Sequence, residues 1–250
     1  MLFDHPLAGL IAAAAAGRFP DMDGGWRRVP PWRPGLEAVV AFTGHAVFAV
    51  RPDITDHRLT ALGANGFGGA HDPRLITALA GPDGWIDSLD ILMAARGVGE
   101  GTAQGAGEGT AQGVGEGIAR GVDRPNVPPA LVSRPDLAGH PRAAFAAGLR
   151  ARPQILGYPD PRRSAMIIVS EGIAGLTELS FELEPDHRGQ GGGAELARDA
   201  LSAIPDGQLA LAAVAPGNAA SLRALLAAGF APLGSVQLFR RARHDPGAPD

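Results

Sequence analysis

The glycine-rich stretch DHRGQGGGAELARDAL, residues 186–201, constrains the fold of this chain more than any other segment. Four glycines fall within the five positions 189–193, and strong helix formers follow directly. Glycine is costly to order, so such a run at the start of a helix needs a reason. A helix N-terminus has free N–H groups and a positive dipole end that suit a phosphate, and missing Cβ atoms let the phosphate approach the backbone. The stretch therefore predicts a phosphate-binding turn between a strand and a helix.

Two common glycine loops do not fit this stretch. A Walker A loop requires Gly-Lys followed by Ser or Thr, and the chain contains no lysine. Residues 189–194 match the dinucleotide-binding pattern GxGxxA, but the next strand and its continuation, LALAAVAPGN at 209–218, lack the acidic residue which that fold requires. The preceding strand also carries glutamates that we expect to be exposed, whereas a buried parallel strand is apolar on both faces.

A series of strands and helices is predicted from residue 140 onward. The expected strands are 153–159, 164–172, 175–185, 208–216 and 236–243, and the expected helices are 140–152, 192–204 and 218–230. The last helix has Asn218 as N-cap and Gly229 as C-cap. Strand 175–185 alternates cleanly. One of its faces carries Leu176, Glu178, Ser180, Glu182 and Glu184, and the other carries Thr177, Leu179, Phe181 and Leu183.

The N-terminal part carries no chemical motif, but its pattern predicts a mixed α/β module. We expect a first helix that is capped by Asp4 and contains Pro6 in its first turn, and its lack of a basic start argues against a signal peptide. Residues 36–50 predict one bent strand or two short ones. Further helices are expected over 51–63 and over 72–81, the latter capped by Asp72, and a strand is expected over 85–97.

An eight-residue repeat, GVGEGTAQ GAGEGTAQ GVGEGIAR GV, occupies residues 97–122. It lacks the apolar residues needed to bury a face, and three short copies are too few for a stacked solenoid. The repeat therefore predicts a flexible tether. The resulting domain plan is an N-terminal α/β module at 1–96, a Gly-rich linker at 97–129 and a second domain at 130–245.

Composition excludes several classes of function. All 22 basic residues are arginine and the net charge is −4, with no basic stripe of the kind that binds nucleic acid. The absence of cysteine excludes disulfides, thiolate nucleophiles and Cys-ligated zinc, and the seven histidines show no metal-binding spacing, so no metal is expected. The N-terminal apolar run is too short to span a bilayer. We expect a cytoplasmic protein that binds neither nucleic acid nor membrane.

Two motifs together resemble the GNAT superfamily of N-acetyltransferases. RGQGGG at 188–193 matches R-x-x-G-x-G, the pyrophosphate loop of that family, and VAPGNAASLRALLAAGFAPLGS resembles its next unit, in which an Asn opens a helix that closes with Gly-Phe. The resemblance covers 154–241 and implies the α/β GNAT fold, a mixed, mostly antiparallel twisted sheet flanked by helices. The N-terminal module is similar to a segment found on some GNAT proteins of high-GC bacteria, and a degenerate half-copy of the fold is one interpretation.

The resemblance implies a site for acetyl-CoA as cosubstrate. Glu178 stands where some members place the general base, and an ordinary exposed strand glutamate is the alternative. Many members carry a tyrosine general acid four residues before the Gly-Phe, where this chain has Leu225, and its one tyrosine, Tyr158, is on another strand. Asn218 would contact the cofactor and cap its helix. The full set of implied cofactor-binding residues is Phe181, Glu182, Leu183, Arg188, Gly189, Gln190, Gly191, Gly192, Gly193 and Asn218.

The sequence thus predicts an acetyl-CoA-dependent N-acetyltransferase that acts on an amine of a small molecule or peptide. The amine would attack the thioester directly while the strand positions both partners. The alternative, favoured by Leu225, is a non-catalytic acyl-CoA-binding module that serves as a sensor or scaffold. Loops and the N-terminal module would select the acceptor, and neither carries a diagnostic motif.

Overall fold

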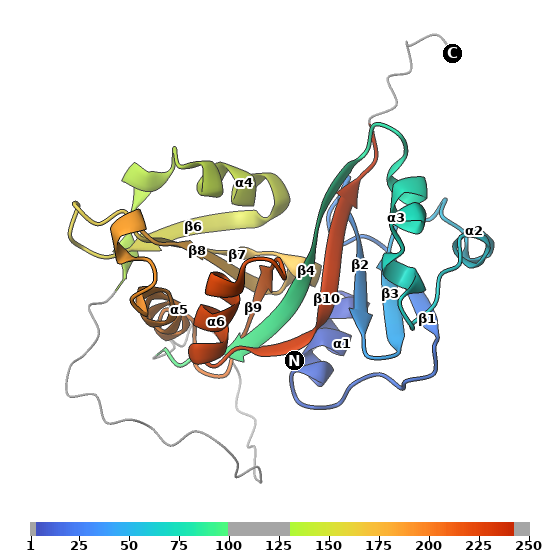
Figure 1. The fold of residues 1–250 in the computed structure, drawn as a ribbon, viewed down its shortest axis with the longest axis horizontal. Helices are drawn as coiled ribbons and strands as arrows, with labels where there is room; N and C mark the ends of the chain where they lie inside the picture. The colour runs from blue at the N-terminus through green and yellow to red at the C-terminus, as the bar shows by residue number, and fades with distance from the viewer. Residues whose placement is uncertain (1–3, 100–130, 243–250) are drawn as a thin grey trace.

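The computed structural model of this protein describes residues 4–99 and 131–242. Its strands form one ten-stranded sheet in the order β1-β3-β2-β10-β4-β9-β8-β7-β6-β5 (Figure 1). The pairs β1–β3 and β8–β9 are parallel, and the other seven pairs are antiparallel. The predicted fold class, a mixed and mostly antiparallel sheet flanked by helices, is confirmed. A doubly wound parallel sheet is excluded by the same pairing.

The N-terminal half contains every predicted helix and strand in the predicted order, together with a short strand, β1, that was not predicted. It contains α1 (Pro6–Ala14), β1 (Trp26–Val29), β2 (Glu37–Phe42), β3 (His45–Ala49), α2 (Asp56–Ala61), α3 (Pro73–Ala80) and β4 (Trp85–Arg96). Residues 36–50 form two strands, because Gly44 takes a positive φ of 72° in the turn between them. Asp72 caps α3 as predicted. The prediction that Asp4 caps α1 is wrong, since the Nδ1 atom of His5 accepts the hydrogen bond from the Leu7 amide.

The C-terminal half contains every predicted helix and strand. Its elements are β5 (Val132–Ser133), α4 (Pro141–Leu149), β6 (Ala151–Gly157), β7 (Met166–Glu171), β8 (Thr177–Glu182), α5 (Gly192–Ser202), β9 (Leu209–Val214), α6 (Ala219–Ala227) and β10 (Ala231–Arg240). Helix α4 ends earlier than predicted because β6 starts at Ala151, and β10 starts earlier than predicted. Gly229 lies one residue beyond the C-cap Ala228 and has a φ of 95°.

Helices cover both faces of the sheet. Leu7 and Ile11 of α1 pack on one face, and α4 packs over β7 on the same face. Helices α2 and α3 cover the opposite face near β3, while α5 and α6 cover it near β9. The predicted alternation of β8 is confirmed, because Leu179 packs with α5 and α6 while Glu178 points to the α4 side. No described helix is long and apolar enough to cross a membrane.

Two long central strands interlock the halves of the chain (Figure 1). Strand β4, from the N-terminal half, lies between β9 and β10, and β10, from the C-terminal half, lies between β4 and β2. The predicted modules 1–96 and 130–245 therefore share one sheet. The linker predicted at 97–129 lies outside the described residues except for 97–99. Those three residues are packed rather than free, because the amides of Gly97 and Gly99 donate to the loop between α5 and β9.

Candidate functional site

Strands β8 and β9 run parallel but separate soon after they begin. Their pairing consists of Thr177 with Ala210 and Glu178 with Leu211. Beyond this point β8 continues to Glu182 and pairs only with β7 on its other edge within the described chain. The edge of β8 that faces β9 therefore leaves backbone groups without a strand partner. Such groups need another partner, either a ligand or water.

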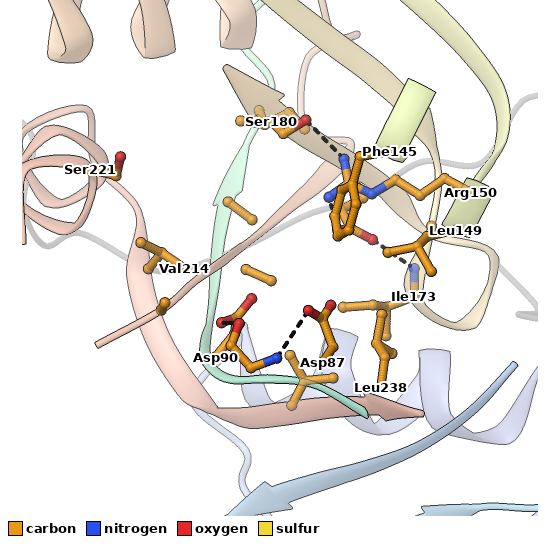
Figure 2. Close-up of a pocket in the computed structure, with 18 of the residues that line it drawn as sticks. Asp87, Asp90, Phe145, Leu149, Arg150, Ile173, Ser180, Val214, Ser221 and Leu238 are labelled. Carbon is orange, nitrogen blue, oxygen red and sulfur yellow. Dashed lines mark hydrogen bonds and ion pairs between the residues drawn. The ribbon is translucent and has the colours of Figure 1, made fainter. Parts of the chain in front are cut away.

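A cavity of about 250 Å³ lies at this separation (Figure 2). Most of its wall comes from the middle of β8, the end of β9, α6, α4 and β4. It is lined by Asp87, Ser88, Asp90, Arg142, Phe145, Leu149, Arg150, Glu178, Leu179, Ser180, Phe181, Ala212–Ala215, Asn218, Ser221 and Leu225, with Trp32, Leu36, Gly172, Ile173, Val236 and Leu238 completing it. The cavity thus opens on the α4 side and reaches the gap between β8 and β9.

The glycine loop lies at the N-terminus of α5, as predicted. Gly191 occupies the N-cap with a φ of 85° and offers no side-chain cap. The amides of Gly192 and Gly193 find no acceptor in the described part of the chain, so they are available to an anion. A Cβ at Gly189 or Gly191 would meet no atom within 4 Å, so the loop is open to solvent. These features fit a bound phosphate group.

Gly193 has a different structural role from its neighbours in the loop. A Cβ built on it would lie 3.1 Å from the Cβ of Ala224 on α6 and 3.5 Å from Leu183. That distance is tighter than ordinary van der Waals contact, so a larger residue would push α5 away from α6. The glycine run therefore serves both an open anion site and the close packing of two helices.

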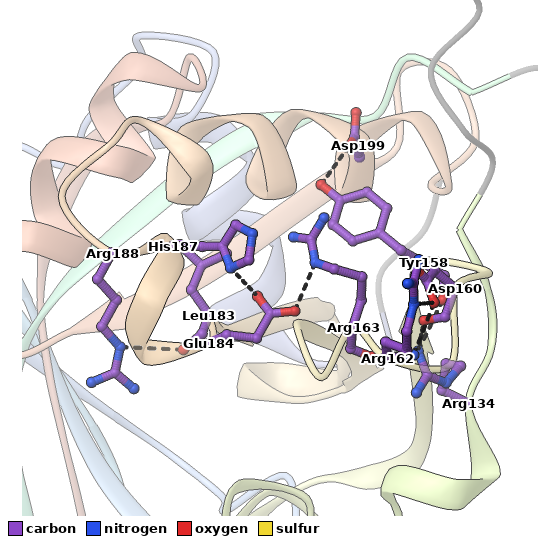
Figure 3. A network of polar contacts seen from close by, with 10 residues as sticks. All are labelled: Arg134, Tyr158, Asp160, Arg162, Arg163, Leu183, Glu184, His187, Arg188 and Asp199. Atoms are coloured by element: carbon purple, nitrogen blue, oxygen red, sulfur yellow. Dashed lines mark hydrogen bonds and ion pairs between the residues drawn. The ribbon is translucent and has the colours of Figure 1, made fainter.

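The Arg188 side chain lies along the end of β8 and stays more than half exposed (Figure 3). Its Nε donates to the carbonyl of Leu183 at 3.2 Å, and its Nη2 lies 3.4 Å from Glu182. Glu182 also accepts from Arg142 at 2.8 Å. The arginine is thus fixed at the rim of the glycine loop, next to the strand edge that is predicted to bind the cofactor.

Glu184 anchors the beginning of the loop (Figure 3). It accepts from Arg163 at 2.8 Å and lies 3.7 Å from the Nδ1 atom of His187. Burial alone would raise the pKa of Glu184, but hydrogen bonds from Arg163 and from the Ala165 amide outweigh it and lower the pKa to about 2. The carboxylate is therefore ionised at neutral pH and holds the loop against the segment that follows β6.

Glu178 is buried in an ion pair. Its Oε1 lies 2.6 Å from Nη2 of Arg150, and its Oε2 accepts from the Ile173 amide at 3.1 Å. Gly172 leaves room for this carboxylate, since a Cβ there would collide with it. The expectation of an exposed strand glutamate is wrong for this residue. Its charge is compatible with burial because Arg150 neutralises it.

Two aspartates of β4, neither of which was predicted to be a site residue, line the cavity. The Ser88 amide donates to Asp87 at 2.9 Å, and the Ser88 hydroxyl donates to Asp90 at 2.7 Å. Burial is the largest influence on both carboxyls and raises their pKa values. The sequence feature that could have indicated them is the polar segment DSLD, residues 87–90, near the start of an otherwise apolar strand.

The remaining predicted residues take clear positions. Asn218 accepts from the Ser221 amide at 3.1 Å, which caps α6, and it also lines the cavity. Leu225 is buried and lines the cavity. The Tyr158 hydroxyl donates to Asp199 of α5 at 3.0 Å, and Tyr158 is not part of the cavity wall. No described group of three His, Asp or Glu side chains is arranged to hold a metal ion.

No family model matches the sequence, and no curated protein matches it either. Among solved structures, the chain is similar to a GNAT-family acetyltransferase from Novosphingobium aromaticivorans, with 18% identity over 64% of this chain and 69% of that chain and a TM-score of 0.38. It is also similar to a GNAT-family acetyltransferase from Colwellia psychrerythraea, with 12% identity over 63% of this chain and 57% of that chain and a TM-score of 0.34. At these values the function has to be argued from the site itself.

Proposed function

We propose that this protein binds acetyl-CoA and transfers its acetyl group to an amine. The observation that carries the proposal is the separation of β8 from β9 directly before the open glycine N-terminus of α5. A free strand edge suits the amide groups of a pantetheine arm, because it offers them backbone hydrogen bonds. An uncapped helix N-terminus suits the pyrophosphate of the same molecule. The two features are joined by the short segment 183–190.

The cofactor-binding residues follow from this arrangement. The backbone of Phe181, Glu182 and Leu183 would bond the pantetheine arm. The loop formed by Arg188, Gly189, Gln190, Gly191, Gly192 and Gly193 would hold the pyrophosphate. Asn218, which caps α6 and lines the cavity, would add a contact from that helix. When bound, the cofactor supplies the acetyl thioester, and the protein orients it in the gap between the strands.

The acceptor would enter from the α4 side of the sheet. The cavity is continuous from that side to the gap between β8 and β9, so an amine and a thioester could meet from opposite faces. Holding both reactants in one site removes most of the entropic cost of bringing them together. The family resemblance implies Glu178 as the general base, but its carboxylate is already held in an ion pair with Arg150.

A non-catalytic acyl-CoA-binding module is the second candidate. The observation that favours it is Leu225, a buried apolar side chain where a proton donor to the departing thiolate would act. A thiolate leaves without such help more readily than an alkoxide, so the leucine slows turnover rather than excluding it. Titration and turnover measurements separate the two candidates.

Isothermal titration with acetyl-CoA tests the cofactor site. Gln190→Glu adds a negative charge to the exposed loop, so affinity should fall about tenfold or more, which corresponds to about 1.4 kcal/mol. The same charge favours the α5 N-terminus, so the melting temperature should not fall. Gln154→Glu, on the exposed surface of β6, is the matched control and should bind like the wild type. Equal affinities for both variants, or no binding by the wild type, would contradict the proposal.

Turnover is measured as release of the CoA thiol with a thiol reagent. The chain contains no cysteine, so the protein contributes no background signal. Release that depends on an added amine supports acetyl transfer. Tight acetyl-CoA binding without release for any amine in a broad set supports the non-catalytic module.

A further inference from the structure

We propose that the acceptor is a primary amine that binds as its ammonium ion beside Asp90 of β4, and that the Asp90 carboxylate accepts the proton which the nitrogen must lose before it attacks. The inference rests on the proposed acetyl transfer and adds the class of acceptor and the proton acceptor. It gives the N-terminal segment of the chain a direct part in the chemistry.

A β-bulge directs both aspartates of β4 into the cavity. Between Ile86 and Leu89, β4 has one residue more than the segment of β10 with which it pairs. In a regular strand Asp87 and Asp90 would face opposite sides, because they are an odd number of residues apart. The extra residue changes the side of Asp87, and both carboxylates line the cavity (Figure 2). Bulges commonly re-aim side chains next to active sites.

Asp90 lies where the thioester would arrive. Its neighbour Ile91 pairs with Val214, the last residue of β9. Asp90 is therefore level with the end of β9. At this level β9 has separated from β8, and Phe181 of β8 lines the cavity. A nitrogen beside Asp90 would face the gap from the α4 side, opposite the cofactor edge of β8.

The cavity carries negative charge that its own residues do not neutralise. In the part of the chain that the structure describes, Asp87 and Asp90 have Ser88 as hydrogen-bond donor and no arginine within ion-pair distance. Burial raises the pKa of Asp90, and the nearby charges of Asp87 and Glu178 raise it further. The Ser88 hydrogen bond and the charge of Arg150 lower it. A partly buried carboxylate is stabilised by a cation, so an ammonium ion fits this end of the cavity.

Glu178 is less suited to receive the proton. Both of its oxygens already have partners, Arg150 at 2.6 Å and the Ile173 amide at 3.1 Å. Protonating it would leave the buried guanidinium of Arg150 without its counter-charge. We assign Glu178 a positioning role, because it fixes Arg150, which also donates to Ser180 at 3.1 Å in the cavity wall.

Aromatic side chains provide room for the carbon skeleton of the acceptor. Trp32 and Phe145 line the cavity, and Phe145 on α4 is half exposed. Aromatic rings bind apolar groups and also attract cations through their faces. The cavity therefore fits a primary alkyl or arylalkyl amine better than an anionic or strongly polar acceptor.

The proposed step balances in atoms and charge. The ammonium ion gives one proton to the Asp90 carboxylate and becomes a free amine. The amine nitrogen forms a bond to the thioester carbonyl carbon, and the carbon–sulfur bond breaks with its electron pair on sulfur. The nitrogen releases its second proton as the amide forms, and the thiolate takes up a proton to give free CoA.

The test uses the full chain with a set of primary alkyl and arylalkyl amines that includes 2-phenylethylamine. 2-Phenylethanol and 3-phenylpropionate serve as its neutral and anionic counterparts. Thiol release should occur with amines only. Asp90→Asn should lower kcat/KM by about 10²–10⁴-fold, the usual contribution of a general base, while leaving the acetyl-CoA affinity unchanged. The residual rate should rise with pH, because free amine then forms without the carboxylate.

Asp83→Asn is the matched control, since Asp83 is exposed in the turn before β4 and is not part of the cavity wall. It should react at the wild-type rate. A wild-type rate for Asp90→Asn, or thiol release with the neutral or anionic probe at the rate seen with the amines, would overturn the inference. Failure of the wild type to bind acetyl-CoA, or to release thiol with any amine, would instead overturn the proposed function, so the two failures are distinguishable.

Discussion

Breaking the buried ion pair between Arg150 and Glu178 should destabilise the protein strongly. The side chains are 10% and 6% exposed and lie 2.6 Å apart. Arg150→Met leaves the carboxylate with only the Ile173 amide as a partner. Loss of one member of a buried pair costs about 3–5 kcal/mol, because the other charge stays desolvated. At about 2–4 °C per kcal/mol for a chain of this size, the melting temperature should fall by about 6–20 °C.

Thermal unfolding followed by circular dichroism measures this change. Arg28→Met is the matched control, because Arg28 pairs with Asp56 at 2.7 Å but the two side chains are 33% and 69% exposed. Its cost should be about 0–1 kcal/mol. The double variant Arg150→Met/Glu178→Leu should recover most of the loss, since apolar residues replace both charges. If Arg150→Met costs no more than the control, the pair is solvated, and Glu178 is then free to act as the general base.

Three further predictions concern packing and pH. Gly193→Ala should destabilise the fold by about 1–3 kcal/mol, because its Cβ would lie 3.1 Å from that of Ala224, and urea unfolding would measure it. The pKa of Glu184 is about 2, below its ordinary 4.5, so the ionised carboxylate stabilises the fold above pH 4.5 and this contribution is lost as pH falls through about 2. Arg163→Met removes its partner, so the melting temperature of that variant should depend less on pH between these values than that of the wild type. Burial raises the pKa of Asp90, so its ionised carboxylate destabilises the fold at high pH. The melting temperature of Asp90→Asn should therefore exceed that of the wild type at pH 8, and the difference should shrink as pH falls and the wild-type carboxylate becomes protonated.

The parts of the fold that the sequence predicted depend on local signals. Asn218 and Gly229 mark the ends of α6 through capping and left-handed backbone conformation, which act within one turn. The alternation in β8 is equally local. The N-cap of α1 was predicted one residue too early, at Asp4, because the residue that caps the helix is His5, a less usual cap than aspartate. Such errors shift boundaries, whereas the short strands β1 and β5 were not predicted at all.

The parts that the sequence did not predict depend on long-range pairing. Alternation places Glu178 on one face of β8, but it does not say whether that face meets water or an arginine. Arg150 follows a different element, α4, and only the packed fold brings the two charges together. The aspartates of β4 were missed for the same reason, because their importance comes from a bulge and from insertion beside β9.

The interlocking of β4 and β10 links the proposed acceptor site to folding. Without β4, both β9 and β10 would expose an unpaired edge in the middle of the sheet, and such edges favour aggregation. The strand that completes the sheet also carries Asp87 and Asp90 into the cavity. The two halves of β4 have different neighbours. Residues 91–96 pair with β9, whereas the bulge lies before them, where β4 pairs with β10 alone. The bulged half is therefore free of the pairing with β9 that fixes the rest of the strand. Under our proposal, substitutions in that half can change the acceptor while the proposed cofactor edge of β8 stays intact.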